Sequence, residues 1–168
     1  MRANADVLSI GIKGLVATAL FFAIAHILSP LVPQDFILGS YGALAVVLIA
    51  LQNEPVASFR TIVTAHMTAA TVGFVLFHAS PFVPAGILVT VTIAVTLFLM
   101  ASMNAIHPPA GAVAFVAVSP HSPVETLGLS FIALCGLAGP VTFVAICRTT
   151  ETVFEQLKNV LFRYSIKR

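Results

Sequence analysis

The chain has 168 residues, of which 59% are hydrophobic and 8% charged, and its net charge is +2 at pH 7. About a quarter of the residues in a soluble domain are charged, so this composition excludes a water-soluble globular fold. The sequence predicts an all-α polytopic membrane protein. Its charges gather near the two ends, and between Gly14 and Cys147 the charged residues are Asp35, Glu54, Arg60 and Glu125.

The small positive charge comes from basic termini, so it does not indicate a nucleic-acid-binding surface. Cys135 and Cys147 fall in one apolar segment and suggest neither a disulfide framework nor a zinc site. No His-Glu-x-x-His spacing occurs among the histidines. We therefore expect no metal and no cofactor.

Four segments are long and apolar enough to cross a hydrocarbon core of about 30 Å. They are residues 14–32, 61–79, 84–106 and 126–147. Two shorter segments, residues 36–51 and 108–119, are rich in Gly, Ala and Val and end near prolines. These predict short crossing helices or re-entrant half-helices, which a bilayer tolerates where protein covers them.

The Lys and Arg residues predict the orientation of the chain. Arg2 and Lys13 lie at one end and five basic residues follow Cys147 at the other. Both termini are therefore expected in the cytoplasm, with four or six crossings of the plasma membrane (the inner membrane of a bacterium). Arg60 favours six crossings, because its loop is then cytoplasmic.

An internal repeat supports the same arrangement. The string Gly-Ala-Leu-Ala-Val-Val at 42–47 reappears as Gly-Ala-Val-Ala-Phe-Val at 111–116, and the order long, short, long occurs twice. Within a transmembrane domain at 1–147, this predicts inverted halves of three crossings at about 14–80 and 84–147. In transporters built this way, short broken helices mark the binding site.

The last segment, residues 148–168, has apolar residues at helical spacing. It predicts a cytoplasmic amphipathic helix that lies on the membrane or on a partner subunit. Thr152 and Glu155 have the spacing of a capping box near its start.

The most specific stretch begins at His107, where two prolines are followed by small residues. A proline pair should end one helix at or before His107 and begin another at Pro108. His107, Pro108 and Pro109 would then lie beside unpaired N–H groups around Ala110 and Gly111, which form an anion site at a helix N-terminus.

The first half has a counterpart in Gly39, Ser40, Tyr41 and Gly42, whose hydroxyl groups add donors. Two such helix starts near the membrane midplane would bind a small anion without a buried Lys or Arg. The predicted spans hold no Asp or Glu, which argues against a cation path. Alternatively, the prolines form a packing kink and the glycines allow close helix contact.

Three further residues are candidates. His66 lies inside a predicted span, where it can bind an anion when protonated or couple transport to protons. Alternatively, it is a neutral histidine bonded to a neighbouring helix. Arg60 either attracts anions or anchors the end of that span. Asn104 can hydrogen-bond the broken helix end or the ligand.

The string His107-Pro108-Pro109-Ala110-Gly111-Ala112 resembles the signature of the HPP family of integral membrane proteins. Residues 39–43, 55–60 and 65–66 are similar to further patterns of that family, and the similarity extends from about residue 36 to residue 147. Members in cyanobacteria and plastids are linked to nitrite transport. The resemblance therefore implies a small monovalent oxyanion as the solute.

The function that we expect is transport of a small inorganic anion, most specifically nitrite, by a non-enzymatic homo-oligomer in the lipid bilayer. Two alternatives stay open. One is a membrane enzyme using the intramembrane histidines, although no nucleophile–base pair or paired carboxylates occur. The other is an interaction or regulatory subunit that recruits a partner through its C-terminal helix.

Overall fold

The structure, a computed structural model, describes residues 2–27 and 38–166, with side chains for 7–27 and 40–160. The end of the predicted first span, Asp35 and the start of the predicted first short segment lie outside the described residues. Every regular element in the described part is helical. The elements are α1 Arg2–Ile27, α2 Leu38–Ala50, η2 Pro55–Ala57, α3 Phe59–Phe77, α4 Ala85–Ser102, α5 Pro108–Ala117, α6 Pro123–Leu127, the π-helix η3 Ile132–Ala138, and α7 Gly139–Ile166.

The lengths of these helices confirm the predicted polytopic membrane protein. In the described part, four segments are long and apolar enough to cross a membrane, and they are Val7–Ile27, Phe59–Phe77, Ala85–Ser102 and Ile132–Val160. The shorter apolar helices are Ser40–Ala50 and Pro108–Ala117. Four long and two short apolar segments therefore occur in the predicted order, although the first begins at Val7 instead of Gly14 and the last at Ile132 instead of Thr126.

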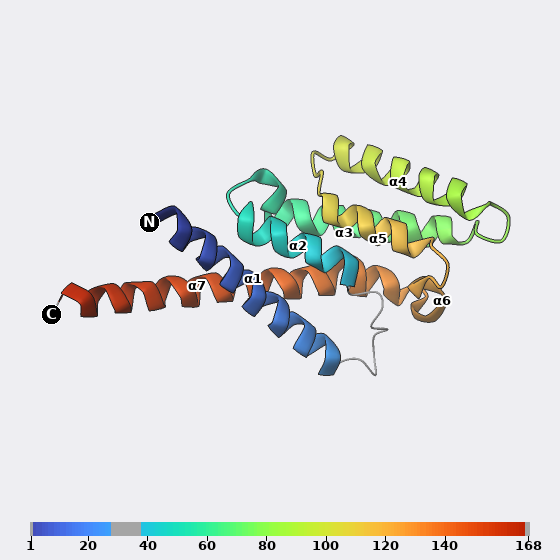
Figure 1. Cartoon of the computed structure of the whole chain (residues 1–168). Helices are drawn as coiled ribbons and strands as arrows, with labels where there is room; N and C mark the ends of the chain where they lie inside the picture. The colour runs from blue at the N-terminus through green and yellow to red at the C-terminus, as the bar shows by residue number, and fades with distance from the viewer. Residues whose placement is uncertain (1, 28–37, 167–168) are drawn as a thin grey trace.

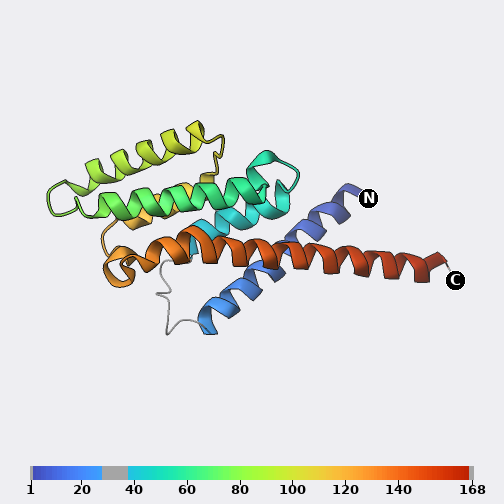
Figure 2. The same cartoon turned by 180° about the vertical axis from the view of Figure 1, so that it is seen from behind.

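The helices run back and forth between two ends of the molecule (Figures 1 and 2). The start of α1, η2 and the end of α7 lie at one end, and the α3–α4 connection and α6 lie at the other. Helices α2 and α5 run in opposite directions and pack against each other. This arrangement agrees with six passes and with both ends of the chain on the same side.

The packing partners follow the order expected for two related halves. Helix α1 packs on α2 and α7, and α4 packs on α5 and α3. If α4, α5 and α7 of the second half correspond to α1, α2 and α3 of the first, the α1–α2 contact corresponds to the α4–α5 contact. In the same way, the α1–α7 contact corresponds to the α4–α3 contact. The division into two inverted repeats stays a prediction, and these contacts support it.

Helix α3 packs against α4, α5 and η3. Its buried residues recur every three or four positions and are mostly small, namely Ile62, Ala65, His66, Ala69, Ala70 and Gly73. The small side chains let α5 and η3 approach closely, as is usual between helices in membranes. A Cβ atom added to Gly136 of η3, for example, would lie 3.1 Å from the Met67 Cα atom. His66 thereby lies on the buried face of the central helix.

The last third of the chain departs from the predicted elements. The predicted span 126–147 begins within α6, and Gly128, with φ +53°, separates that helix from the π-helical η3. Helix α7 then continues past Cys147 to Ile166, so the tail is not a separate helix. The predicted capping box is wrong, because the Thr152 hydroxyl lies mid-helix and donates to the Arg148 carbonyl at 2.9 Å.

An ion pair joins the first and last helices. The Lys13 Nζ atom lies 2.6 Å from a Glu151 carboxylate oxygen and 3.5 Å from one of Glu155. Lys13 is buried where α1 and α7 meet. The pair neutralises a lysine that would otherwise be costly inside an apolar segment.

Candidate anion site

The connection between α4 and α5 places His107 at the end of a helix. Helix α4 ends at Ser102, and Asn104 has a left-handed φ of 51°. His107 is extended, with φ −144° and ψ 101°, and caps α5, whose first residue is Pro108. The predicted helix break at or before His107 is therefore confirmed.

The His107 ring is held by a residue far away in the chain. Its Nδ1 atom lies 2.9 Å from the Val56 carbonyl oxygen, 51 positions earlier. Because a carbonyl oxygen only accepts hydrogen bonds, His107 Nδ1 must carry the hydrogen. The neutral ring then has a lone pair and no hydrogen at Nε2.

His66 is held in the same way from within its own helix. Its Nδ1 atom donates to the Ile62 carbonyl oxygen at 2.9 Å, one turn earlier on α3. Its Nε2 atom is therefore also without a hydrogen in the neutral state.

The two imidazole rings are neighbours inside the protein. Their centroids are 5.2 Å apart, the ring planes are inclined at 49°, and both residues are 0% exposed. Neither Nε2 atom has a hydrogen-bond partner among the described residues. An unsatisfied buried polar atom costs about 1–3 kcal/mol, so two such atoms on neighbouring rings make this pair the candidate site.

The backbone donors expected at the start of α5 are fewer than predicted. Pro108 and Pro109 have no N–H group, and the Ala110 N–H donates to the His107 carbonyl at 3.1 Å. The expectation of free amide donors around Ala110 is corrected accordingly. A Cβ atom at Gly111 would meet nothing within 4 Å, so that glycine is not required by packing. The partial positive charge of the helix end remains beside His107.

The predicted counterpart at 39–42 lies in the first turns of α2, which begins at Leu38. The Ser40 hydroxyl is buried without a partner in the described part of the chain. The Tyr41 ring, however, packs on Phe21 and Phe143, with centroids 4.5 and 5.7 Å away, so it points towards α1 and α7. Gly42 is exposed. The structure thus joins His66 to His107 but places Tyr41 in a separate aromatic cluster.

A cavity of about 360 Å³ is lined in part by residues that neighbour or hold His107. Val56, whose carbonyl holds His107, is one of its lining residues, and Ile106 precedes His107 in the chain. Asn104 lines it as well, whereas Arg60 is exposed on the first turn of α3 and is not among the lining residues. The residues that line the cavity are Glu54, Pro55, Val56, Thr61, Asn104 and Ile106.

Glu54 was missed as a site residue by reasoning from the sequence. Its place directly before Pro55, in the loop that precedes α3, was the available signal. The sequence favours the nearby Arg60 instead, because a cation attracts an anion.

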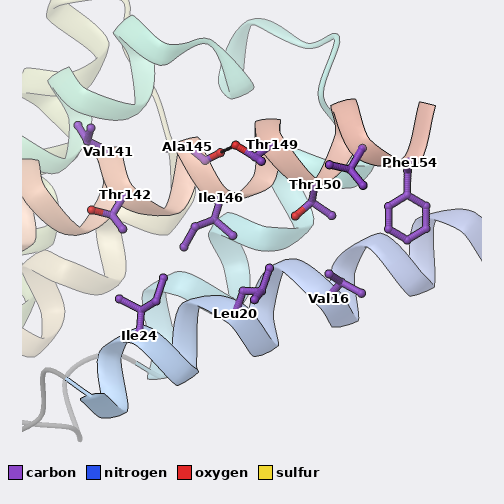
Figure 3. A pocket seen from close by; sticks show the side chains of 11 residues that line it. Val16, Leu20, Ile24, Val141, Thr142, Ala145, Ile146, Thr149, Thr150 and Phe154 are labelled. Atoms are coloured by element: carbon purple, nitrogen blue, oxygen red, sulfur yellow. Dashed lines mark hydrogen bonds between the residues drawn. The ribbon is translucent and has the colours of Figure 1, made fainter. Parts of the chain in front are cut away.

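A second cavity, of about 530 Å³, lies between α1 and α7 (Figure 3). Leu20 and Ile24 of α1 face Ile146 of α7 across it, and the Thr149 hydroxyl is bonded to the Ala145 carbonyl. None of the described residues that line it is charged or a histidine. Its surface therefore suits an apolar molecule rather than a small anion. Across the residues that the structure describes, no group of three or more His, Cys, Asp or Glu side chains is placed to hold a metal ion.

Comparison with known proteins identifies the family. The sequence profile of the HPP transmembrane region matches residues 2–158. The chain belongs to the HPP family. Two curated transmembrane proteins of Dictyostelium discoideum are similar to this HPP protein, one 33% identical over 59% of the chain and the other 36% identical over 49%. The matched regions are 36% and 27% of those proteins, so the HPP chain covers about a third of their length. No solved structure matches it.

Proposed function

We propose that this HPP protein transports a small monovalent oxyanion, nitrite first of all, through a site at His66 and His107. The observation that carries the proposal is the buried pair of imidazoles whose Nε2 atoms lack partners among the described residues. A solute that engages these atoms would relieve two unfavourable unsatisfied groups. Membership of the HPP family, which includes members linked to nitrite transport, supports nitrite as the first anion to test.

The surroundings of the pair favour an anion over a permanent cation. Helices α4, α5 and η3 pack against α3 and contain no Asp, Glu, Lys or Arg. A buried cation would find no carboxylate there to balance its charge. The N-terminal end of α5, in contrast, contributes a partial positive charge next to His107.

The cavity of about 360 Å³ supplies an entry route in this proposal. It lies beside η2, at the end of the molecule where α1 begins and α7 ends. Among the described residues, the lining includes Val56 and Ile106 but neither histidine, so in this proposal the solute reaches the histidines when the η2 loop or the α4–α5 connection moves. The Glu54 carboxylate repels anions at this cavity, and it repels a multivalent anion more strongly than a monovalent one.

Flux measurements in liposomes test the proposal. Purified protein should admit nitrite faster than protein-free liposomes do. His107→Asn should reduce that excess by about tenfold or more, equivalent to about 1.4 kcal/mol. The asparagine amide can replace Nδ1 as a donor to Val56, but it places nothing at the position of Nε2.

His78→Asn is the matched control. The His78 Nδ1 atom donates to the Phe74 carbonyl at 2.9 Å, as His66 does to Ile62, but its ring is exposed. This variant should transport nitrite as the wild type does. If nitrite equilibrates no faster than in protein-free liposomes under any gradient, the proposed function is wrong.

A recruiting subunit remains the second candidate, because α7 exposes apolar side chains around and beyond the ion pair. Val153, Leu157 and Val160 are 45, 54 and 49% exposed. Replacing these three residues together by serine retains Glu151 and Glu155, and with them the contacts to Lys13. A transporter should keep nitrite flux in this triple variant, whereas a recruiting subunit should lose its partner and its function in cells.

A further inference from the structure

The hydrogen bonds of the two histidines restrict what they can bind. Each ring donates its Nδ1 hydrogen to a backbone carbonyl oxygen. His107 donates to Val56, and His66 donates to Ile62. In the neutral state, both rings therefore have a lone pair at Nε2, and both Nε2 atoms are buried without a partner among the described residues on rings whose centroids are 5.2 Å apart. A lone pair repels an anion, and the prolines of α5 leave few amide donors to replace it. An anion needs a hydrogen on at least one Nε2 atom.

We propose that the His66–His107 pair takes up one proton together with each anion, so that the protein is an electroneutral proton–anion symporter. This inference rests on the proposed function and names its coupling ion. A proton from water forms an N–H bond with the lone pair of one Nε2 atom, and that N–H donates to an anion oxygen. On the other side of the membrane, the N–H bond breaks, and the proton and the anion are released together into the water. No net charge crosses the membrane.

The geometry limits the uptake to one proton. With ring centroids 5.2 Å apart, two imidazolium ions would repel each other strongly in a buried site. The anion compensates the first positive charge, but nothing nearby compensates a second. The start of α5, which is itself partly positive, opposes further positive charge on His107.

The other titratable groups around the pair do not take over this role. Helices α4 and α5 carry none, and Glu54 and Arg60, near η2 and α3, are exposed. Among the residues whose side chains the structure describes, neither histidine ring has a hydrogen bond, ion pair or ring contact with any titratable side chain except the other histidine. The remaining titratable groups of described position on the elements packed against α3 and α5 are Tyr41, Glu125, Cys135, Cys147, Arg148, Glu151, Glu155 and Lys158.

The decisive experiment measures what drives nitrite into liposomes that contain the full chain. The membrane potential is set with valinomycin and potassium gradients, and the pH gradient is set independently. Initial rates are taken at mildly alkaline pH, and the rate in protein-free liposomes is subtracted because nitrous acid crosses lipid unaided. An entrapped dye reports the internal pH.

If the protein is a symporter, the rate of nitrite uptake should depend on the pH gradient and not on the membrane potential. Protein-dependent uptake should acidify the interior by one proton per nitrite and stay unchanged when the potential is reversed. A uniporter would instead respond to the potential, which at about 59 mV drives a tenfold accumulation of a monovalent ion. Potential-driven uptake without proton entry overturns the coupling while leaving transport established. The absence of any protein-dependent uptake overturns the proposed function itself.

Substitution by glutamine gives an independent test. In His66→Gln or His107→Gln, the side-chain amide places a permanent N–H near the position of Nε2, so an anion no longer needs a proton there. Any nitrite uptake by these variants should follow the membrane potential. His78→Gln is the control and should stay electroneutral. Monodisperse elution in detergent verifies the fold, and a folded glutamine variant whose uptake is still accompanied by one proton contradicts the proposal.

Discussion

Lys13 on α1 and Glu151 on α7 form an ion pair of 2.6 Å although they are 138 positions apart in the chain. The Lys13 side chain is 9% exposed and that of Glu151 is 28% exposed, so water screens the pair only in part. It connects the first and last helices, which no loop joins directly. Its removal should therefore affect the whole bundle.

Lys13→Met should lower the free energy of unfolding by about 2 kcal/mol, between the values for surface and buried pairs. The cost arises because the Glu151 carboxylate is left partly buried without a partner. Thermal unfolding in detergent measures the change. Lys158→Met removes an exposed contact of 3.0 Å with Glu155 and should cost under about 0.5 kcal/mol. If both substitutions lower the free energy of unfolding equally, the Lys13–Glu151 pair does not stabilise the bundle more than an exposed ion pair does.

The glycines of the bundle should differ sharply in their tolerance of alanine. A Cβ atom at Gly73 would overlap the Ala117 Cβ atom of α5, whereas one at Gly86 would meet nothing within 4 Å. Gly73→Ala should therefore destabilise the protein by about 1–3 kcal/mol. Gly86→Ala should be neutral or stabilising by up to about 1 kcal/mol through helix propensity. The same unfolding assay compares them, and a harmless Gly73→Ala would show that α3 and α5 are not so closely packed.

The charges near the cavity beside η2 should change the affinity of the protein for the anion. Glu54 lines the cavity, so Glu54→Gln removes repulsion at the mouth and should lower the KM for nitrite about two- to threefold at low ionic strength. Salt should reduce the effect, since the Debye length is only about 8 Å at physiological ionic strength. Arg60→Gln, from the exposed start of α3, should shift KM in the opposite direction. Kinetics at two salt concentrations measure both, and a KM that rises in Glu54→Gln would exclude this entry route.

The side of the membrane reached by each loop can be read by cysteine labelling. The loop before η2 lies at the end of the molecule where α1 begins and α7 ends, whereas the α3–α4 connection lies at the opposite end. In a Cys135→Ala, Cys147→Ala background, Gln52→Cys should react from the side of the termini and Phe82→Cys from the other. An impermeant maleimide applied to oriented vesicles tests this. Labelling of both positions from one side would favour four crossings.

Local rules predicted much of this fold because they depend on neighbours in the chain. The proline pair at 108–109 predicted both the end of one helix and the start of the next, and the run of apolar residues predicted the spans. His66 and His107 could be named as candidates, since ionisable residues in apolar spans are uncommon.

Their arrangement could not be predicted in the same way. The bond from His107 to the Val56 carbonyl joins residues 51 positions apart and depends on how η2 packs against α5. Tyr41 shows the reverse case. Its position in a repeat predicted a ligand-binding hydroxyl, but the large ring is accommodated where Gly139 leaves room, and a Cβ there would overlap its oxygen. The space beside Gly139 therefore decides where the Tyr41 ring lies, and the repeat pattern could not predict this position.

The π-helical segment Ile132–Ala138 sets the direction of every side chain that follows it. Its i→i+5 bonds hold more residues in a turn than the 3.6 of an α-helix. Deleting one residue from it would let these wide turns close into α-helical turns, so that α7 keeps its direction. A deletion in the α-helical part of α7 before Glu151 would instead rotate Glu151 by about 100° about the helix axis, away from Lys13. The π-helical segment is therefore the part of this helix in which the register tolerates the loss of one residue.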